Sequence, residues 1–297
     1  MTKVTFIIPS YNSSVTLPRT IESIFKQTVN DFEVIIVDSS DDQTAKKEVL
    51  AVSSDRVKVI SLNKKTGPAE GRNIGASQAR GELLCFVDSD VALAPDWLGK
   101  VLEAYADKCL AGCGSVDIHE SQKGNDLAWA QLLLQFNESL PYNGRREIGM
   151  VPACNMFCDR KLFQEAGGFP NMRASEDVVL CIKLRKIYSI WFVPQARAYH
   201  IFRESKQAYY NNQVMLGKYI LFYRRDFVKS WYSQGLWPLL FLPAFVAIKL
   251  YRISSRIQKN AAVYRQKYWN VLPLFLVGVY FWTKGFALAV FEKGEVV

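Results

Sequence analysis

The chain has 297 residues, of which 49% are hydrophobic, and this content excludes a generally disordered protein. Its length allows one large domain or two. The formal net charge of +9 is uneven, because residues 201–297 hold 14 Lys and Arg against 4 Asp and Glu, whereas residues 1–200 hold 23 against 24. Aromatic and aliphatic runs accompany the basic third. They favour an anionic membrane surface, and not nucleic acid, as its partner.

The first half of the chain alternates between strand and helix patterns. Apolar or β-rich runs predict strands over residues 3–8, 33–37, 57–62 and 83–87. Helical spacing and helix-start residues predict helices from residue 17 onward and over 43–53, 68–80 and 95–106. Such alternation is typical of an α/β fold with a parallel sheet and right-handed crossovers.

Residues 83–87 form the most apolar of these runs, and they end at Asp88-Ser89-Asp90. Ligands of open α/β sheets lie beyond the carboxyl ends of the strands, so both aspartates stand where a ligand is expected. Two carboxylates beside a diphosphate would suit Mg²⁺ or Mn²⁺. A solvated turn is the alternative for the triplet alone.

The helix expected over residues 68–80 contains Gly71 and Gly75. Each glycine weakens a helix by about 1 kcal/mol relative to alanine, and a close approach of the helix backbone to a neighbouring element is one compensation. Neither G-x-G-x-x-G nor G-x-x-x-x-G-K-[ST] occurs in the chain. A dinucleotide site and a P-loop are therefore not supported.

The six cysteines lie mostly in apolar stretches, and no C-x-x-C pair occurs. This pattern predicts buried, reduced thiols in a reducing compartment, and not zinc ligands. Met1-Thr2-Lys3 leads directly into the first expected strand, so we expect no signal peptide.

A series of short motifs runs through residues 4–205. They are Pro9-Ser10-Tyr11-Asn12, Val37-Asp38, Gly71-Arg72-Asn73-Ile74-Gly75, Phe86-Val87-Asp88-Ser89-Asp90, Ala166-Gly167-Gly168-Phe169-Pro170 and Ser175-Glu176-Asp177, followed by Leu180, Arg185, Pro194 and His200. In order and approximate spacing the series resembles the family-2 glycosyltransferases of the GT-A fold. The resemblance implies a Rossmann-like, mostly parallel sheet flanked by helices, with a nucleotide-sugar-binding and catalytic domain over residues 1–205.

The resemblance also implies roles for single residues at the donor site. Pro9 and Tyr11 would lie at the nucleotide, with Tyr11 stacked on the base and Asp38 accepting a hydrogen bond from it. Arg72 would approach the nucleotide, and Asp88 would contact the ribose or the metal. The alternatives are a half-buried loop aromatic for Tyr11, a loop cap for Asp38 and a solvated helix arginine for Arg72.

Two further residues complete the metal site that the resemblance implies. Asp90 would bind the Mn²⁺ or Mg²⁺ that bridges the two phosphates, with Asp88 and His200 as further ligands. A structural histidine is the alternative for His200. Arg203 could contact a phosphate or an anionic acceptor, and Asn155 is expected to face the site from a strand near residues 152–158.

Ser175 is a good N-cap residue for a helix that starts with Glu176 and Asp177. Acids are favoured there by the helix dipole alone, which would keep Asp177 ionised while lowering its basicity. By resemblance Asp177 is the general base that removes the proton of the acceptor hydroxyl, and Glu176 supports it. One base suffices for direct displacement with inversion.

Residues 206–297 are expected to form a helical region for membrane association. The apolar run 236–248 is too short to cross a bilayer, which needs about 20 residues, whereas 271–291 could span it despite Lys284. The basic segment between these runs favours an interfacial position on anionic headgroups. A helical hairpin buried in a homo-oligomer is the alternative.

Together these features predict a metal-dependent, inverting glycosyltransferase at the cytoplasmic side of the cell membrane. It would move one sugar from a nucleoside-diphosphate sugar to a hydroxyl acceptor on a lipid-linked glycan or a polyprenyl lipid. The Q-x-x-R-W signature of processive members is missing, so a single transfer is expected. One alternative is a non-catalytic nucleotide-sugar-binding scaffold of a membrane glycan-assembly complex. Another is a nucleotidyltransferase, although its glycine- and lysine-rich loop is missing.

Overall fold

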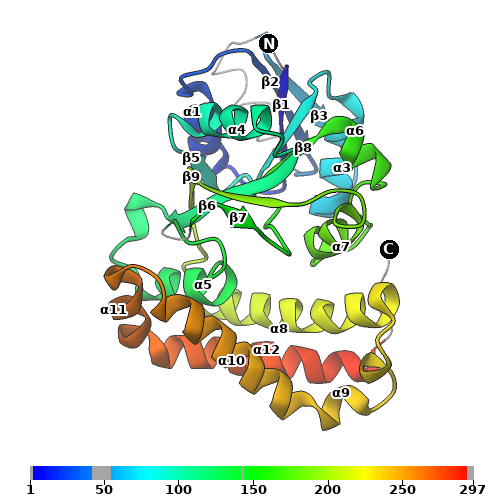
Figure 1. The fold of residues 1–297 in the computed structure, drawn as a ribbon, viewed down its shortest axis with the longest axis vertical. Coiled ribbons are helices and arrows are strands. Elements are labelled where there is room, and N and C mark those ends of the chain that lie inside the picture. Colours follow the sequence, from blue (N-terminus) through cyan, green and yellow to red (C-terminus); the bar gives the residue numbers. More distant parts are fainter. Residues whose placement is uncertain (1–2, 42–54, 142–143, 293–297) are drawn as a thin grey trace. The chain divides into compact units, whose positions relative to one another are not determined.

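The computed structural model describes residues 3–41, 55–141 and 144–292 (Figure 1). The chain divides into two compact units, Met1–Asp117 with Gly144–Ile201 and Ile118–Asn143 with Phe202–Val297. The helix expected over 43–53 lies outside the described residues. The division into functional domains at residues 205 and 206 stays a prediction.

The first unit is built on one sheet, which contains nine strands within the described ranges. The strands are β1 Val4–Ser10, β2 Phe32–Asp38, β3 Val57–Ser61, β4 Leu83–Val87, β5 Val91–Leu93, β6 Ala111–Ile118, β7 Arg146–Glu147, β8 Asn155–Asp159 and β9 Trp191–His200. Their order is β3-β2-β1-β4-β8-β6-β9-β5, with β7 beside β9. Strands β1 to β4 pair in parallel as expected, whereas β8 joins β4 and β6 antiparallel, as β5 and β7 join β9. The sheet is therefore mixed.

Helices cover both faces of this sheet (Figure 1). They are α1 Leu17–Phe25, α3 Pro68–Gln78, α4 Trp97–Ala106, α6 Arg160–Glu165 and α7 Glu176–Leu184. Successive side chains of a strand point to opposite faces. Phe6 of β1 accordingly packs against Trp97 of α4, with 5.8 Å between the ring centroids. Ile7, on the other face, joins a buried cluster with residues of α3, α6 and α7.

The two glycines of α3 lie where this helix meets β1. A Cβ at Gly75 would overlap the side chain of Ile7, and one at Gly71 would lie 3.2 Å from Cβ of Pro9. The close approach expected to compensate for two helical glycines is thus confirmed. Its consequence is that Arg72, between them, is held against the sheet.

The second unit is helical. Its α-helices in the described residues are α5 Asp126–Gln135, α8 Lys206–Tyr223, α9 Trp237–Leu240, α10 Leu242–Gln258, α11 Ala262–Asn270 and α12 Leu272–Leu288. Helices α8 and α12 lie side by side (Figure 1). A Cβ at Gly217 of α8 would overlap the backbone of Trp282, and one at Gly285 of α12 would overlap that of Val214. The two backbones are therefore in direct contact.

One segment of this unit meets the length and apolarity that a membrane-crossing helix needs. Among the helices of the described residues, Leu272–Phe291 alone does so, with a mean hydropathy of 1.7, and 39% of its most apolar 18-residue window is buried inside the protein. Core helices of soluble proteins pass the same test. The segment therefore allows membrane association without requiring it.

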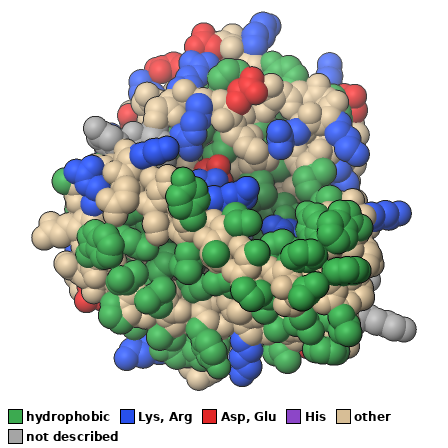
Figure 2. Space-filling view, turned by 60° about the horizontal axis from the view of Figure 1, so that its bottom comes forward, with side chains coloured by type: hydrophobic (Ala, Val, Ile, Leu, Met, Phe, Trp, Pro, Cys, Tyr) green, Lys and Arg blue, Asp and Glu red, His purple; other side chains and the backbone are tan. Residues whose placement is uncertain are grey.

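The second unit also carries most of the exposed apolar surface. Of the 18 large hydrophobic side chains that are exposed in the described part of the chain, 14 lie between Phe227 and Phe291. Trp231 and Trp237, for example, are 65% and 50% exposed. The face in Figure 2 shows hydrophobic side chains gathered together, with Lys and Arg side chains among and around them. Such a surface is typical of a site that contacts a membrane or another protein.

Candidate active site

Most of the predicted site residues belong to one edge of the sheet in the first unit. Asp38 ends β2, Asp88 and Asp90 follow β4, and His200 ends β9. Because β1, β2 and β4 are parallel, their carboxyl ends meet at the same edge. The N-terminus of α7, with Glu176, is joined to this edge through Arg72.

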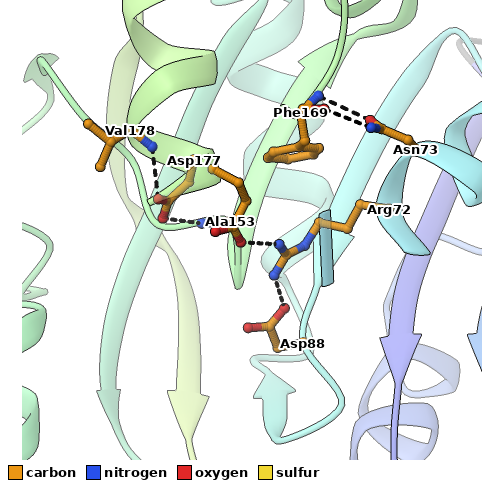
Figure 3. Close-up of polar contacts among 8 residues, drawn as sticks. Arg72, Asn73, Asp88, Ala153, Phe169, Asp177 and Val178 are labelled. Carbon is orange, nitrogen blue, oxygen red and sulfur yellow. Dashed lines mark hydrogen bonds and ion pairs between the residues drawn. The ribbon is translucent and has the colours of Figure 1, made fainter. Parts of the chain in front are cut away.

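Arg72 is the buried link between these elements (Figure 3). Its Nη1 donates to Oε1 of Glu176 at 2.7 Å, and its Nη2 donates to Oδ1 of Asp88 at 2.6 Å. Burial opposes the charge of Arg72, but the two carboxylates outweigh burial and raise its pKa. Its two Nη atoms thus hold carboxylates of this chain, a role that the sequence did not reveal.

The loop that follows α6 is fastened to α3 beside Arg72. Asn73 donates from Nδ2 to the carbonyl of Phe169 at 2.8 Å and accepts from its N–H at 3.0 Å (Figure 3). Gly168 has a φ of +66°, and a Cβ there would lie 2.8 Å from Oδ1 of Asn73. Two motifs that are 96 residues apart are therefore joined by hydrogen bonds. The ring centroid of Phe169 lies 5.4 Å from Cζ of Arg72.

Asp177 lies in the first turn of α7 and is held by backbone donors. Val178 N–H donates to its Oδ1 at 2.8 Å, and Ala153 N–H donates to its Oδ2 at 3.4 Å. Ser175 precedes the helix with a φ of +63°, and within the described residues its side chain caps no backbone N–H. The expected side-chain cap is therefore wrong, because the left-handed backbone at Ser175 replaces the extended backbone of an ordinary N-cap.

Burial dominates the electrostatics of the two adjacent acids. It raises the pKa of Glu176 to about 7, with a further contribution from the charge of Asp177 and against the effect of Arg72. Burial also raises the pKa of Asp177, against Arg72 and the two N–H donors. The direction is opposite to the one expected from the helix dipole. At a buried helix N-terminus the loss of hydration is the larger effect.

Two of the three predicted metal ligands lie together. The antiparallel pair of β5 and β9 places Val91 opposite His200, so that Oδ1 of Asp90 lies 3.7 Å from Nε2 of His200. Asp88 instead holds Arg72. No group of three His, Cys, Asp or Glu side chains that could hold a metal occurs in the residues that the structure describes.

The loops after β1 and β2 are joined beside this edge. Asn12 N–H donates to Oγ of Ser40 at 2.7 Å, and Oγ of Ser40 donates to Oδ1 of Asp38 at 2.7 Å. Tyr11 is 37% exposed, and Nζ of Lys65 lies 4.1 Å from its ring centroid. Tyr11 is thus accessible to a flat ligand. Lys65 beside it is a neighbour that the sequence did not single out.

Two predicted substrate-binding residues of the first unit do not join this group, and a third belongs to the other unit. Pro9 packs β1 onto α3 at Gly71. Asn155 is fully buried, where it accepts from Nε1 of Trp97 at 2.8 Å and donates to the carbonyl of Ser115 at 2.9 Å. Its amide is therefore occupied inside the protein and does not face the edge as expected. Arg203 belongs to the second unit and is exposed.

Comparisons with known proteins show the family of the chain. The model of the family described as Glycosyl transferase family 2 matches residues 5–167. The succinoglycan biosynthesis protein ExoO of Rhizobium meliloti is 37% identical over 100 residues, which are 34% of this chain and 29% of that protein. The GalNAc(5)-diNAcBac-PP-undecaprenol beta-1,3-glucosyltransferase of Campylobacter jejuni is 36% identical over 106 residues, which are 35% of this chain and 34% of that protein. Each alignment thus spans about a third of its relative or less.

A solved structure extends the likeness over nearly the whole chain. The mannosyltransferase PcManGT of Pyrobaculum calidifontis, in complex with GDP-Man and Mn²⁺, has a TM-score of 0.64 at 16% sequence identity. The match covers 97% of this chain and 85% of that one. At this identity it shows the fold alone, and the expected GT-A fold is confirmed. Because the family model matches residues 5–167, more than half of the chain, the chain belongs to glycosyl transferase family 2.

Proposed function

We propose that the protein is a metal-dependent, inverting glycosyltransferase that moves one sugar from a nucleoside-diphosphate sugar to a hydroxyl acceptor. The observation that carries the proposal is the group of carboxylates at the ligand-binding edge of the sheet, where Arg72 joins Asp88 to Glu176 and Asp177 follows Glu176 in the first turn of α7. Membership of the family and a GT-A neighbour solved with GDP-Man support the choice of donor. The transfer is a single one, as expected from the missing processive signature.

Asp177 acts as the general base. The acceptor oxygen attacks the anomeric carbon, the bond from this carbon to the diphosphate breaks, and the hydroxyl proton passes to the carboxylate of Asp177. The raised pKa of Asp177 favours this role, since a base works best when its pKa approaches the operating pH. The N–H groups of Val178 and Ala153 hold the carboxylate in place, and Arg72 fixes Glu176 beside it.

Asp90 and His200 would hold the divalent metal. A carboxylate and an imidazole are suitable ligands for Mn²⁺, whereas Mg²⁺ prefers oxygen ligands. Since the pair supplies two ligands, the remaining positions suit phosphate oxygens of the donor and water. When bound, the metal stabilises the negative charge on the departing nucleoside diphosphate. Asp88, oriented by Arg72, is then available to the ribose.

The loops after β1 and β2 bind the nucleobase of the donor and the groups next to it. Tyr11 presents an accessible ring for stacking, and Asp38 accepts a hydrogen bond from the base. Pro9 contributes through the shape of β1, on which α3 is packed. Arg203 contacts a phosphate or an anionic acceptor, whereas Asn155 acts only by packing behind the site.

The acceptor is lipid-linked, and the protein works at the cytoplasmic side of the cell membrane. The name of the Campylobacter jejuni relative specifies an undecaprenol-linked diphosphate. The exposed aromatic and aliphatic side chains between Phe227 and Phe291, with the basic residues among them, suit an anionic membrane interface. A homo-oligomer that buries the same side chains is the alternative arrangement.

The test is sugar transfer from a panel of nucleoside-diphosphate sugars to acceptors in a membrane extract, with and without Mn²⁺. We expect metal-dependent transfer that falls at least about a hundredfold in Asp90→Ala, since the metal contributes several kcal/mol to charge stabilisation. Asp96→Ala removes an exposed acid directly before α4, away from this edge, and is expected to keep full activity.

Full activity of Asp90→Ala would contradict the assignment of Asp90 as a metal ligand. Donor binding measured by calorimetry, without transfer to any acceptor, would favour the non-catalytic scaffold. Release of pyrophosphate would instead identify a nucleotidyltransferase.

A further inference from the structure

The second unit holds three cations close together, Lys249, Arg224 and Arg256, here called the basic cluster. Lys249 and Arg256 are seven residues apart on α10 and so lie on the same face of the helix. Nζ of Lys249 lies 4.5 Å from the ring centroid of Trp282. The guanidinium of Arg224, at the end of α8, lies 5.6 Å from the ring centroid of Phe245. Lys249 and Arg224 therefore each pack against an aromatic ring.

The cluster is short of negative charge. The acids of the second unit in the described residues are Glu120, Asp126, Glu138, Glu204, Asp226 and Glu292. Glu138 pairs with Arg256 at 3.1 Å, and four of the others pair with cations outside the cluster. Neither Lys249 nor Arg224 forms an ion pair with a carboxylate in the part of the chain that the structure describes.

Burial and the neighbouring positive charges all disfavour the protonated form of Lys249. Burial lowers its pKa to about 8, and the charges of Arg224 and Arg256 lower it further in the same direction. Grouped cations with one carboxylate among them are costly for the protein alone, because each loses hydration and repels the others. An anion bound between them would remove this cost.

We propose that the basic cluster binds the phosphate group of a lipid. This group is either the diphosphate of a polyprenyl-linked acceptor or the headgroup of an anionic membrane lipid. Arginine forks and a lysine suit phosphate oxygens, which accept several charge-assisted hydrogen bonds at once. The identity of the lipid as acceptor rests on the proposed function, whereas the phosphate site itself does not.

The surroundings of the cluster favour a lipid over a soluble phosphate. Ile248, which precedes Lys249 on α10, is 47% exposed. Trp237 and Leu240 on α9, directly before this helix, are exposed as well. A ligand with a phosphate and a hydrocarbon chain can satisfy the cations and cover these side chains together.

The test compares Lys249→Met with Arg252→Met, which removes the same charge from an exposed position of the same helix. Binding is measured by flotation with vesicles of phosphatidylcholine alone, with added phosphatidylglycerol, and with added polyprenyl diphosphate. We expect Lys249→Met to weaken binding to the two kinds of anionic vesicle at least about thirtyfold, against about fivefold for a surface cation such as Arg252.

The two sources of phosphate give different results. A preference of the wild type for polyprenyl diphosphate that disappears in Lys249→Met supports the acceptor site. Equal Lys249-dependent binding to both anionic vesicles supports a headgroup site. Equal weakening by Lys249→Met and Arg252→Met, or full binding to phosphatidylcholine alone, would overturn the proposal.

Thermal unfolding without lipid controls for folding. Lys249→Met is expected to be at least as stable as the wild type, because it removes a repelled cation from an aromatic contact. Inorganic pyrophosphate should raise the unfolding midpoint of the wild type and of Lys249→Arg, but not that of Lys249→Met; equal shifts in all three would contradict the site. Since these readouts involve no sugar transfer, loss of transfer with intact lipid binding would refute the proposed function alone.

Discussion

The two units of this protein differ in whether their cations are paired with carboxylates of the chain. In the first unit the buried cation Arg72 is held by two carboxylates, each within 2.7 Å of a guanidinium nitrogen. In the second unit Lys249 and Arg224 have no carboxylate partner among the described residues, and 14 of the 18 exposed large hydrophobic side chains lie there as well. The first unit thus pairs its buried arginine with carboxylates of its own. The second leaves cations and apolar side chains for a partner outside the chain.

The largest effect should come from breaking the charge network of the first unit. Arg72→Met leaves Glu176 buried beside Asp177 without its cation, and removing one partner of a buried pair costs about 3–5 kcal/mol in the free energy of unfolding. Arg80→Met is the matched control, since Arg80 pairs with Glu33 while its side chain is 80% exposed, and such a pair contributes about 0–1 kcal/mol. Urea unfolding measures both. Equal effects would show that the Arg72 network is not buried as described.

The acids of this network should make stability depend on pH. A carboxyl group with a raised pKa stabilises the folded state below its ordinary pKa, and this stability is lost as the pH rises through the raised value. For Glu176, with a pKa of about 7, the loss falls between about pH 5 and pH 8 and amounts to about 3 kcal/mol at most. Urea unfolding at several pH values measures it, and Asp177 contributes in the same direction.

Glu176→Gln tests the source of this pH dependence. The slope between pH 5 and pH 8 should flatten in this variant, whereas Glu103→Gln, which alters an exposed side chain of α4, should keep the slope of the wild type. An unchanged slope in Glu176→Gln would mean that Glu176 is not the group that titrates.

A smaller loss is expected where the second unit is packed as a protein core. Gly217→Ala places a methyl group against the backbone of Trp282, and overpacking of this kind costs about 1–3 kcal/mol. Gly124→Ala, in open space in the same unit, should change the free energy of unfolding by less than about 0.5 kcal/mol. Detergent-free unfolding monitored by near-ultraviolet circular dichroism distinguishes the two. Tolerance of Gly217→Ala would indicate that α8 and α12 are not in backbone contact.

The smallest expected effect concerns the exposed aromatic surface. Trp231→Ser combined with Trp237→Ser should lower partition into anionic vesicles by about tenfold or more, because complete burial of a large apolar side chain contributes about 1.5–3 kcal/mol and only about half of each side chain, 65% and 50%, is left to bury. Val15→Ser, which alters a 76% exposed side chain of the first unit, should leave partition unchanged. If the double variant instead keeps its partition and loses an oligomeric state, the apolar surface is a subunit interface.

Elements that depend on local pattern could be predicted from the sequence. The strands at Leu83–Val87 and Phe32–Asp38 follow from apolar runs that stop at acids, and the start of α1 follows from Pro18. Asp90 and His200 were grouped from the family resemblance, and the structure brings them within 3.7 Å. The strands and the start of α1 rest on short local patterns, whereas the grouping of Asp90 with His200 rests on the family resemblance alone, and their role as metal ligands stays a prediction.

Contacts across long sequence separations could not be predicted in this way. Arg72 and Glu176 are 104 residues apart, and no periodicity relates them. Asn155 was expected to face the site, but the antiparallel register of β8 against β4 turns its side chain into the interior. A shift of one residue in register reverses the face of every side chain, and this register depends on the whole sheet.

The most direct test of the catalytic assignment is a single-turnover measurement of sugar transfer by Asp177→Asn with saturating donor. Loss of a general base should lower the rate by about 10²–10⁴-fold while the dissociation constant of the donor stays unchanged. Asp126→Asn, which alters an acid in the first turn of another helix, should transfer at the rate of the wild type. Transfer by Asp177→Asn at the wild-type rate would contradict the role of Asp177 and the mechanism built on it.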